Sequence, residues 1–116
     1  MFKFEKLAVW RKSIAFAELV YEVTRDFPSD ERFGLTNQIR RAAGSIASNI
    51  AEGSARSDPD FVRFVGYAAG SLYEVVTQSC IARNQTFLAP ADFERVYADA
   101  EEISRMLSGL RESLGG

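Results

Sequence analysis

Apolar residues recur at alternating steps of three and four along four stretches of the chain. This spacing places apolar side chains on one face of an α-helix. It predicts helices over residues 5–27, 32–54, 59–87 and 90–113, and no stretch alternates as a strand does. The predicted inward-facing stripes are Leu7, Trp10, Ile14, Ala17, Tyr21 and Thr24; Leu35, Ile39, Ala42, Ile46 and Ile50; Phe61, Val65, Ala68, Leu72, Val75, Ser79 and Ala82; and Phe93, Val96, Ala100, Ile103, Leu107, Leu110 and Leu114.

Three prolines separate these stretches. Pro28 disfavours helical backbone at the residue before it, while Pro59 and Pro90 suit the first turn of the helices that follow. Helices of this length joined by such short loops must lie as antiparallel neighbours. The sequence therefore predicts one all-α domain over residues 1–116, an up-down-up-down four-helix bundle.

The predicted helices 5–27 and 59–87 each carry a second apolar stripe beside the first. A tightly packed bundle can bury such wide apolar arcs in its own core. We favour the other interpretation, a homo-oligomer, because monomers rarely expose contiguous apolar patches of this kind. The predicted interface residues are Val9, Phe16, Val20, Val62, Gly66, Ala69, Tyr73 and Val76.

Small and polar residues crowd the inward positions of helices 32–54 and 59–87. Glycine weakens a helix by about 1 kcal/mol relative to alanine, so Gly44, Gly66 and Gly70 suggest close approach of two backbones. Polar side chains between the helices then form a network that fixes their register, or alternatively a site for a small ligand or metal. The candidates are Gln38, Ser45, Asn49, Ser71, Glu74 and Gln78.

The chain contains no histidine and one cysteine, Cys80. This removes Ser/His/Asp and Cys/His catalysis, di-iron sites that need histidine, disulfides and structural zinc. Carboxylates alone can still bind a hard cation, for which Glu52 and Glu74 with Asn49 are conceivable ligands. We expect a non-enzymatic protein without a cofactor, in which Cys80 packs as a small hydrophobic residue.

Lys and Arg total 14 against 16 Asp and Glu, a formal net charge of −2. Charge interrupts every apolar run well before membrane-spanning length, and the first residues do not resemble a secretion signal, so we expect a cytoplasmic protein. The basic candidates for a phosphate-binding surface are Arg11, Lys12, Arg40, Arg41, Arg56 and Arg63. These cations can equally be solvated or paired with acids, and Arg41 can equally form a salt bridge between subunits.

The segment QIRRAAGSIASNIAEG, residues 38–53, resembles the signature of the bacterial family of proteins encoded in intervening sequences of 23S rRNA genes, the S23 family. The resemblance extends to Leu7 with Trp10 and Lys12, to Phe27 and Pro28, and to residues 68–74 with Gln78. It implies a small cytosolic bundle that assembles as a ring-like homopentamer. A similar protein, the basic accessory protein of diversity-generating retroelements, is pentameric and associates with a reverse transcriptase and nucleic acid.

Residues and resemblance together predict a non-enzymatic, oligomeric bundle with a binding or scaffolding role. RNA or a nucleic-acid enzyme is the favoured partner. The alternative is a bundle that binds a small ligand or metal through the polar residues of helices 32–54 and 59–87.

Overall fold

Helices account for all of the regular structure in the computed structural model, which describes residues 1–116. The four α-helices are α1, Ala8–Val23; α2, Leu35–Ser54; α3, Asp58–Asn84; and α4, Pro90–Ser113. Short 3-10 turns at Lys3–Lys6 and Ser29–Glu31 precede α1 and α2. The prediction of an all-α protein with four helices is confirmed.

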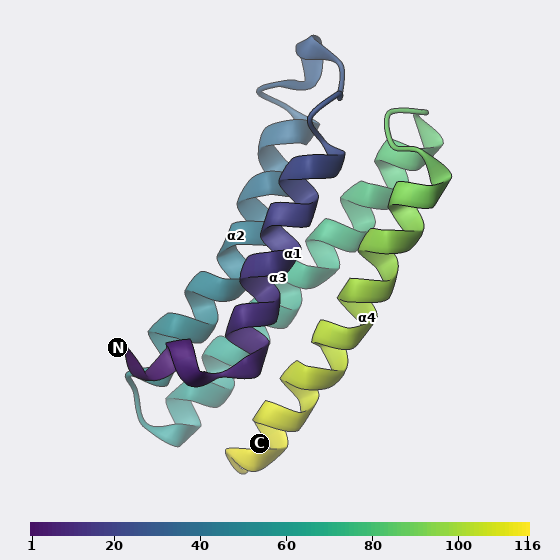
Figure 1. The fold of residues 1–116 in the computed structure, drawn as a ribbon. Helices are drawn as coiled ribbons and strands as arrows, with labels where there is room; N and C mark the ends of the chain where they lie inside the picture. Colours follow the sequence, from purple (N-terminus) through teal and green to yellow (C-terminus); the bar gives the residue numbers. More distant parts are fainter.

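The helices form an elongated body that measures 42 × 22 × 22 Å. The α1–α2 and α3–α4 loops lie at one end, and the α2–α3 loop lies at the other end with both termini (Figure 1). Each helix contacts two others: α1 and α3 each contact both α2 and α4. The α2–α3 contact is the most extensive. A shared core fills the space between them.

The predicted core stripes of α2, α3 and α4 are confirmed. The core contains Ile39, Ile46 and Ile50 of α2, Leu72 and Val75 of α3, and Val96 and Ile103 of α4, all at most 1% exposed. The alanines at 42, 43, 68 and 100 are also buried there. Apolar side chains removed from water on one face of each helix supply the main stabilisation of the bundle.

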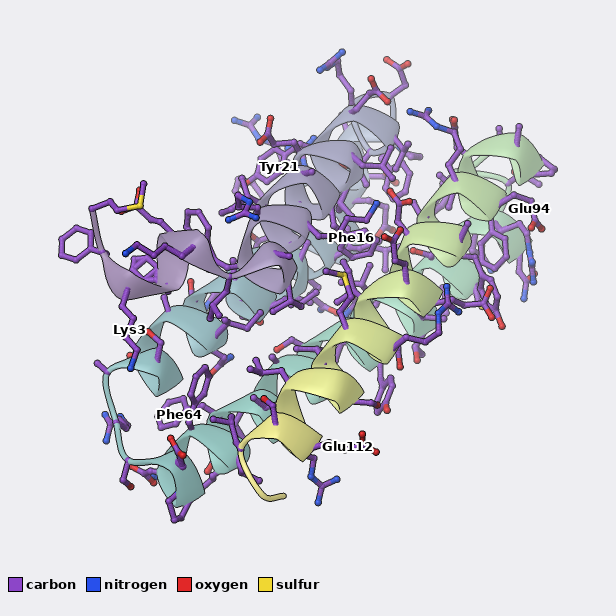
Figure 2. The ribbon with its side chains drawn as sticks, turned by 60° about the horizontal axis from the view of Figure 1, so that its bottom comes forward. Lys3, Phe16, Tyr21, Phe64, Glu94 and Glu112 are labelled. Carbon is purple, nitrogen blue, oxygen red and sulfur yellow. The ribbon has the colours of Figure 1, made fainter.

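The predicted core face of α1 is wrong in part: Thr24 is buried and Leu7, Trp10 and Ala17 are partly buried, but two of its residues are exposed. Ile14 is 36% exposed and Tyr21 is 51% exposed, whereas Val9, Phe16 and Val20 are 5%, 0% and 0% exposed. The stripe assigned to an oligomer interface therefore belongs to the core of the single chain. Figure 2 shows Phe16 between the helices and Tyr21 on the outer side of α1.

Ser13 explains why the pattern on α1 was misread. It lies in the middle of the true core face and is fully buried, and its hydroxyl donates a hydrogen bond of 2.7 Å to the carbonyl oxygen of Val9. Thr24 donates in the same way to Val20, also at 2.7 Å. Because each hydroxyl is satisfied within its own helix, it can be buried at little cost.

Three predicted helices are too long, and the first and second, predicted from residues 5 and 32, begin at Ala8 and Leu35. The first, 5–27, ends at Val23, and the Phe27 N–H closes a turn onto the Thr24 carbonyl ahead of Pro28. The third, 59–87, ends at Asn84 because Thr86 adopts a positive φ of 65°, which cannot continue a right-handed helix.

Close backbone approach occurs at a different glycine from those expected. A Cβ atom at Gly44, Gly66 or Gly70 would meet nothing within 4 Å, so the prediction that these glycines permit close approach is wrong within one chain. A Cβ at Gly53 would lie 2.6 Å from Cδ1 of Phe61 and 2.7 Å from Cβ of Phe64. The end of α2 and the start of α3 therefore pack closely because residue 53 has no side chain.

Exchanging Phe16 for alanine tests the corrected face of α1. Phe16→Ala removes a fully buried ring and leaves a cavity, so we expect a loss of about 3–5 kcal/mol in the free energy of unfolding. Ile14→Ala, on the exposed face, is the matched control and should cost less than about 1 kcal/mol. Urea denaturation followed by circular dichroism measures both. Equal losses would contradict the assignment.

Candidate functional site

A polar groove of about 500 Å³ runs between α2 and α3. Seven of its eight lining residues are charged or polar, and five of them belong to the six-residue polar network predicted from the sequence. The lining consists of Asn37, Gln38, Arg41, Ala42, Ser45, Ser71, Glu74 and Gln78. The sequence thus identified five of the residues that line this groove. It predicted that they lie between the helices as a core network, whereas the groove is open to solvent.

Hydrogen bonds join α2 to α3 across the floor of the groove. The hydroxyl oxygens of Ser45 and Ser71 lie 2.5 Å apart, and Gln78 Nε2 donates a long hydrogen bond of 3.5 Å to Gln38 Oε1. The other side-chain polar atom of Gln78, Oε1, is buried without a partner. A buried acceptor without a donor is costly.

The remaining two members of the predicted network do not join it. Asn49 donates to the Ser45 carbonyl of its own helix at 2.8 Å, and Glu74 is exposed and forms no hydrogen bond. Asn37 also lines the groove but was missed by the sequence analysis. Its position four residues before Arg41, on the same face of α2, is the helical signal that identifies it.

Arg41 is the cation of this groove. It is exposed, and it takes part in no ion pair, side-chain hydrogen bond or cation–π contact within the chain. Its neighbour Arg40 points elsewhere: its Nε donates to Thr24 Oγ1 at 2.9 Å, and its guanidinium lies 4.7 Å from the centroid of the Tyr21 ring. Arg41 is therefore free to bind an anion, whereas Arg40 partly holds α1 against α2.

The other predicted basic residues have partners. Lys12 pairs with Asp99 at 3.3 Å and Glu102 at 3.2 Å, which ties α1 to α4. Arg11 donates to the Glu5 carbonyl at 2.9 Å. Arg56 and Arg63 both pair with Asp60, at 3.3 and 2.6 Å. Of the six predicted residues, three are held by carboxylates, Arg11 and Arg40 have only neutral hydrogen-bond acceptors, and Arg41 has no partner of either kind.

Four members of the ion pairs of this chain have pKa values shifted toward their charged forms. The hydrogen bond to Glu102 raises the pKa of Lys12, with a smaller contribution from Asp99. The hydrogen bond from Arg63 lowers the pKa of Asp60. Hydrogen bonds to Glu22 and Asp92 raise the pKa of Arg95. Lys12, Asp60 and Arg95 therefore stay ionised near neutral pH.

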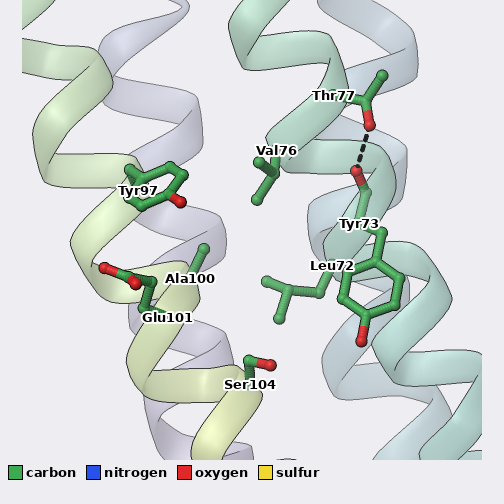
Figure 3. Close-up of a pocket in the computed structure, with 8 residues that line it drawn as sticks. All are labelled: Leu72, Tyr73, Val76, Thr77, Tyr97, Ala100, Glu101 and Ser104. Carbon is green, nitrogen blue, oxygen red and sulfur yellow. Dashed lines mark hydrogen bonds between the residues drawn. The ribbon is translucent and has the colours of Figure 1, made fainter.

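An apolar groove of about 320 Å³ lies between α3 and α4, in the region of the predicted second stripe of α3 (Figure 3). Tyr73 and Val76 of α3 line it together with Tyr97 of α4. A smaller groove of about 100 Å³ contains Gly66 and Ala69 and shares Tyr73 with the first. Tyr97 was missed by the sequence analysis, although it follows the core residue Phe93 by one helical turn.

Five of the eight predicted interface residues lie on this α3–α4 surface or are partly exposed beside it, namely Val62, Gly66, Ala69, Tyr73 and Val76. The other three, Val9, Phe16 and Val20, are core residues and are excluded from any interface. Cys80, predicted to pack as a core hydrophobic residue, is partly buried and unpaired.

Two further properties bear on function. No group of three or more cysteine, aspartate or glutamate side chains is placed to hold a metal ion. None of the helices combines the length and apolar character required to cross a membrane.

Comparisons with known proteins agree with the fold. A family model described as 23S rRNA-intervening sequence protein matches residues 5–109, and no curated protein matches the chain. The fold is shared with the crystal structure of a protein with unknown function from the S23 ribosomal protein family from Bacteroides thetaiotaomicron VPI-5482. The TM-score is 0.82, with 23% identity over 90% of this chain and 95% of that one. The chain belongs to the family of 23S rRNA-intervening sequence proteins.

Proposed function

We propose that this protein is a non-enzymatic, cytoplasmic binding protein, an antiparallel bundle that self-assembles and takes single-stranded RNA in its α2–α3 groove. The observation that carries this proposal is Arg41, which has no partner within the chain, in a groove whose other polar lining consists of amides, hydroxyls and the Glu74 carboxylate. The family description, which refers to 23S rRNA, supports the choice of RNA. The similarity to the accessory protein of diversity-generating retroelements remains a prediction from the sequence.

The chemistry of the groove suits single-stranded RNA. Asn37 and Gln38 offer amide groups that can pair with unstacked base edges, while Ser45 and Ser71 offer hydroxyls for the 2′-OH. Arg41 supplies one phosphate contact. With a net charge of −2, affinity cannot come from a general basic surface, so it must come from repetition of this groove in an assembly.

Charge reversal at Arg41 tests RNA binding. We expect Arg41→Glu to weaken binding of a short fluorescein-labelled single-stranded RNA by about 10-fold or more, because one charge-assisted phosphate contact is replaced by repulsion. The dependence of affinity on salt should also become shallower, by about 0.7 in slope for each phosphate that is no longer neutralised. Fluorescence anisotropy at several salt concentrations measures both quantities.

Arg105→Glu is the matched control, since it makes the same charge change at an exposed position of α4. Equal losses in the two variants would mean that only net charge matters. If no RNA binds at any salt while small polar molecules raise the melting temperature, the alternative is correct and the groove is a small-ligand site. The unpartnered Gln78 Oε1 is the observation that favours this alternative.

The α3–α4 surface supports self-assembly. Tyr73 and Tyr97 are 60% and 41% exposed, beside the partly buried Val76. Gly66 and Gly70 on α3 have open space where a Cβ would lie, so nothing within the chain requires these glycines. A helix of a second copy packed here would cover the apolar side chains and could approach closely at the two glycines. A homopentamer is the assembly that the family resemblance favours.

A charge placed in this surface should separate the subunits. Tyr73→Glu is expected to dissociate the assembly without loss of helix, because an ionised carboxylate would have to be buried without a partner. Tyr21→Glu, at a tyrosine on α1 with 51% exposure, is the control and should leave the assembly intact. Size-exclusion chromatography and circular dichroism report assembly and fold. A Tyr73→Glu variant that elutes with the unmodified protein would exclude this surface.

A further inference from the structure

A second basic site lies at the end of the bundle where α1 turns into α2. It is a surface pocket of about 300 Å³, and three of its eight lining residues are arginines while none is acidic. The lining consists of Thr24, Arg25, Phe27, Pro28, Ser29, Arg32, Thr36 and Arg40. Only Arg40 belongs to the basic set expected from the sequence.

None of the three arginines is neutralised by a carboxylate. The ion pairs of the chain involve Lys12, Arg56, Arg63 and Arg95, and they leave Arg25, Arg32 and Arg40 without an acidic partner. The nearby acids do not fill this role: Asp26 and Asp30 are exposed and outside the lining, and the Glu31 carboxylate accepts a hydrogen bond of 3.2 Å from the Leu35 N–H. The lining of this pocket therefore carries three positive charges and no carboxylate.

The wall of the pocket also contains unsatisfied hydrogen-bonding groups. Thr36 is 8% exposed, and its hydroxyl oxygen is buried without a partner. Thr36 lies in the first turn of α2, where neither its N–H nor that of Asn37 finds an acceptor. The start of a 20-residue helix carries a partial positive charge that favours an anion.

One guanidinium is already held in place. Arg40 is fixed by its hydrogen bond of 2.9 Å to Thr24 Oγ1 and by its position over the Tyr21 ring, while its neighbours Arg25 and Arg32 are exposed. Arginine presents paired N–H donors in a planar fork that matches two oxygens of a tetrahedral oxyanion. A fixed arginine beside two exposed ones can therefore surround such an anion.

We propose that this pocket binds a phosphate group, either free phosphate or the terminal phosphate of a nucleic acid strand. Arg25, Arg32 and Arg40 contact its oxygens, and Thr36 supplies a hydroxyl donor. A pocket rather than a continuous basic stripe suits one phosphate with several exposed oxygens better than the repeating backbone of a duplex. The free-phosphate form of this site is independent of RNA binding in the α2–α3 groove, and only the strand-end form rests on it.

The test is isothermal titration calorimetry of the full chain with inorganic phosphate, at ionic strength held constant with sodium chloride. We expect saturable binding that falls by about 10-fold or more in Arg25→Gln/Arg32→Gln, because charge-assisted hydrogen bonds are removed. Thr36→Val keeps the side-chain shape and should also weaken binding. Arg105→Gln on α4 is the control for charge and should bind as the unmodified protein does. Circular dichroism verifies the fold of each variant.

A comparison of one short RNA with a 5′-phosphate and with a 5′-hydroxyl separates the two sources. Tighter binding of the phosphorylated strand, abolished in Arg25→Gln/Arg32→Gln but kept in Arg41→Glu, assigns the pocket to strand ends. Phosphate binding without any preference between the strands assigns it to the free anion. The proposal is overturned if phosphate does not bind the unmodified protein, or if it binds the Arg25→Gln/Arg32→Gln variant equally well.

Discussion

The second apolar face of α3 constrains the rest of this molecule. One face packs into the core through Leu72, Val75 and their neighbours, whereas on the other Ala69 and Val76 are only partly buried and Tyr73 is 60% exposed. Consequently Tyr73 lines an open groove beside α4, and Gly66 and Gly70 have no neighbours within the chain. A second copy is the partner that resolves this constraint most simply, because it brings the same apolar surface and leaves the polar α2–α3 groove on a different side of α3.

Pairing of charges then determines where the chain can bind anions. Carboxylates neutralise Lys12, Arg56, Arg63 and Arg95, partly along the α1–α4 seam and partly within the first turns of α3 and α4. Surface pairs of this kind contribute little to stability, but a cation held in such a pair is less available to bind another anion. Two arginines of α2 have no carboxylate partner. Arg41 lines the α2–α3 groove, and Arg40 lines the pocket that also contains Arg25 and Arg32. A chain with a net charge of −2 therefore still has arginines without a carboxylate partner at two places on its surface.

The sequence predicted most of the fold and five of the polar residues that line the α2–α3 groove. The stripes of α2, α3 and α4 were readable because their core positions are almost all apolar, and the polar groove because its residues follow the helical period. The face of α1 was misread because Ser13 lies in the core and Tyr21 on the surface, a reversal that only internal hydrogen bonding makes tolerable. The Arg25–Arg32–Arg40 pocket was missed because a turn, not a periodic pattern, brings these residues together.

Self-association through α3 is the central claim, and the mass of the unmodified protein tests it most directly. Native mass spectrometry over a range of protein concentrations should detect an assembly of several 12.9 kDa chains, with five favoured by the family resemblance. A single 12.9 kDa species at every concentration would contradict the account, since the apolar face of α3 would then be stable in water without a partner.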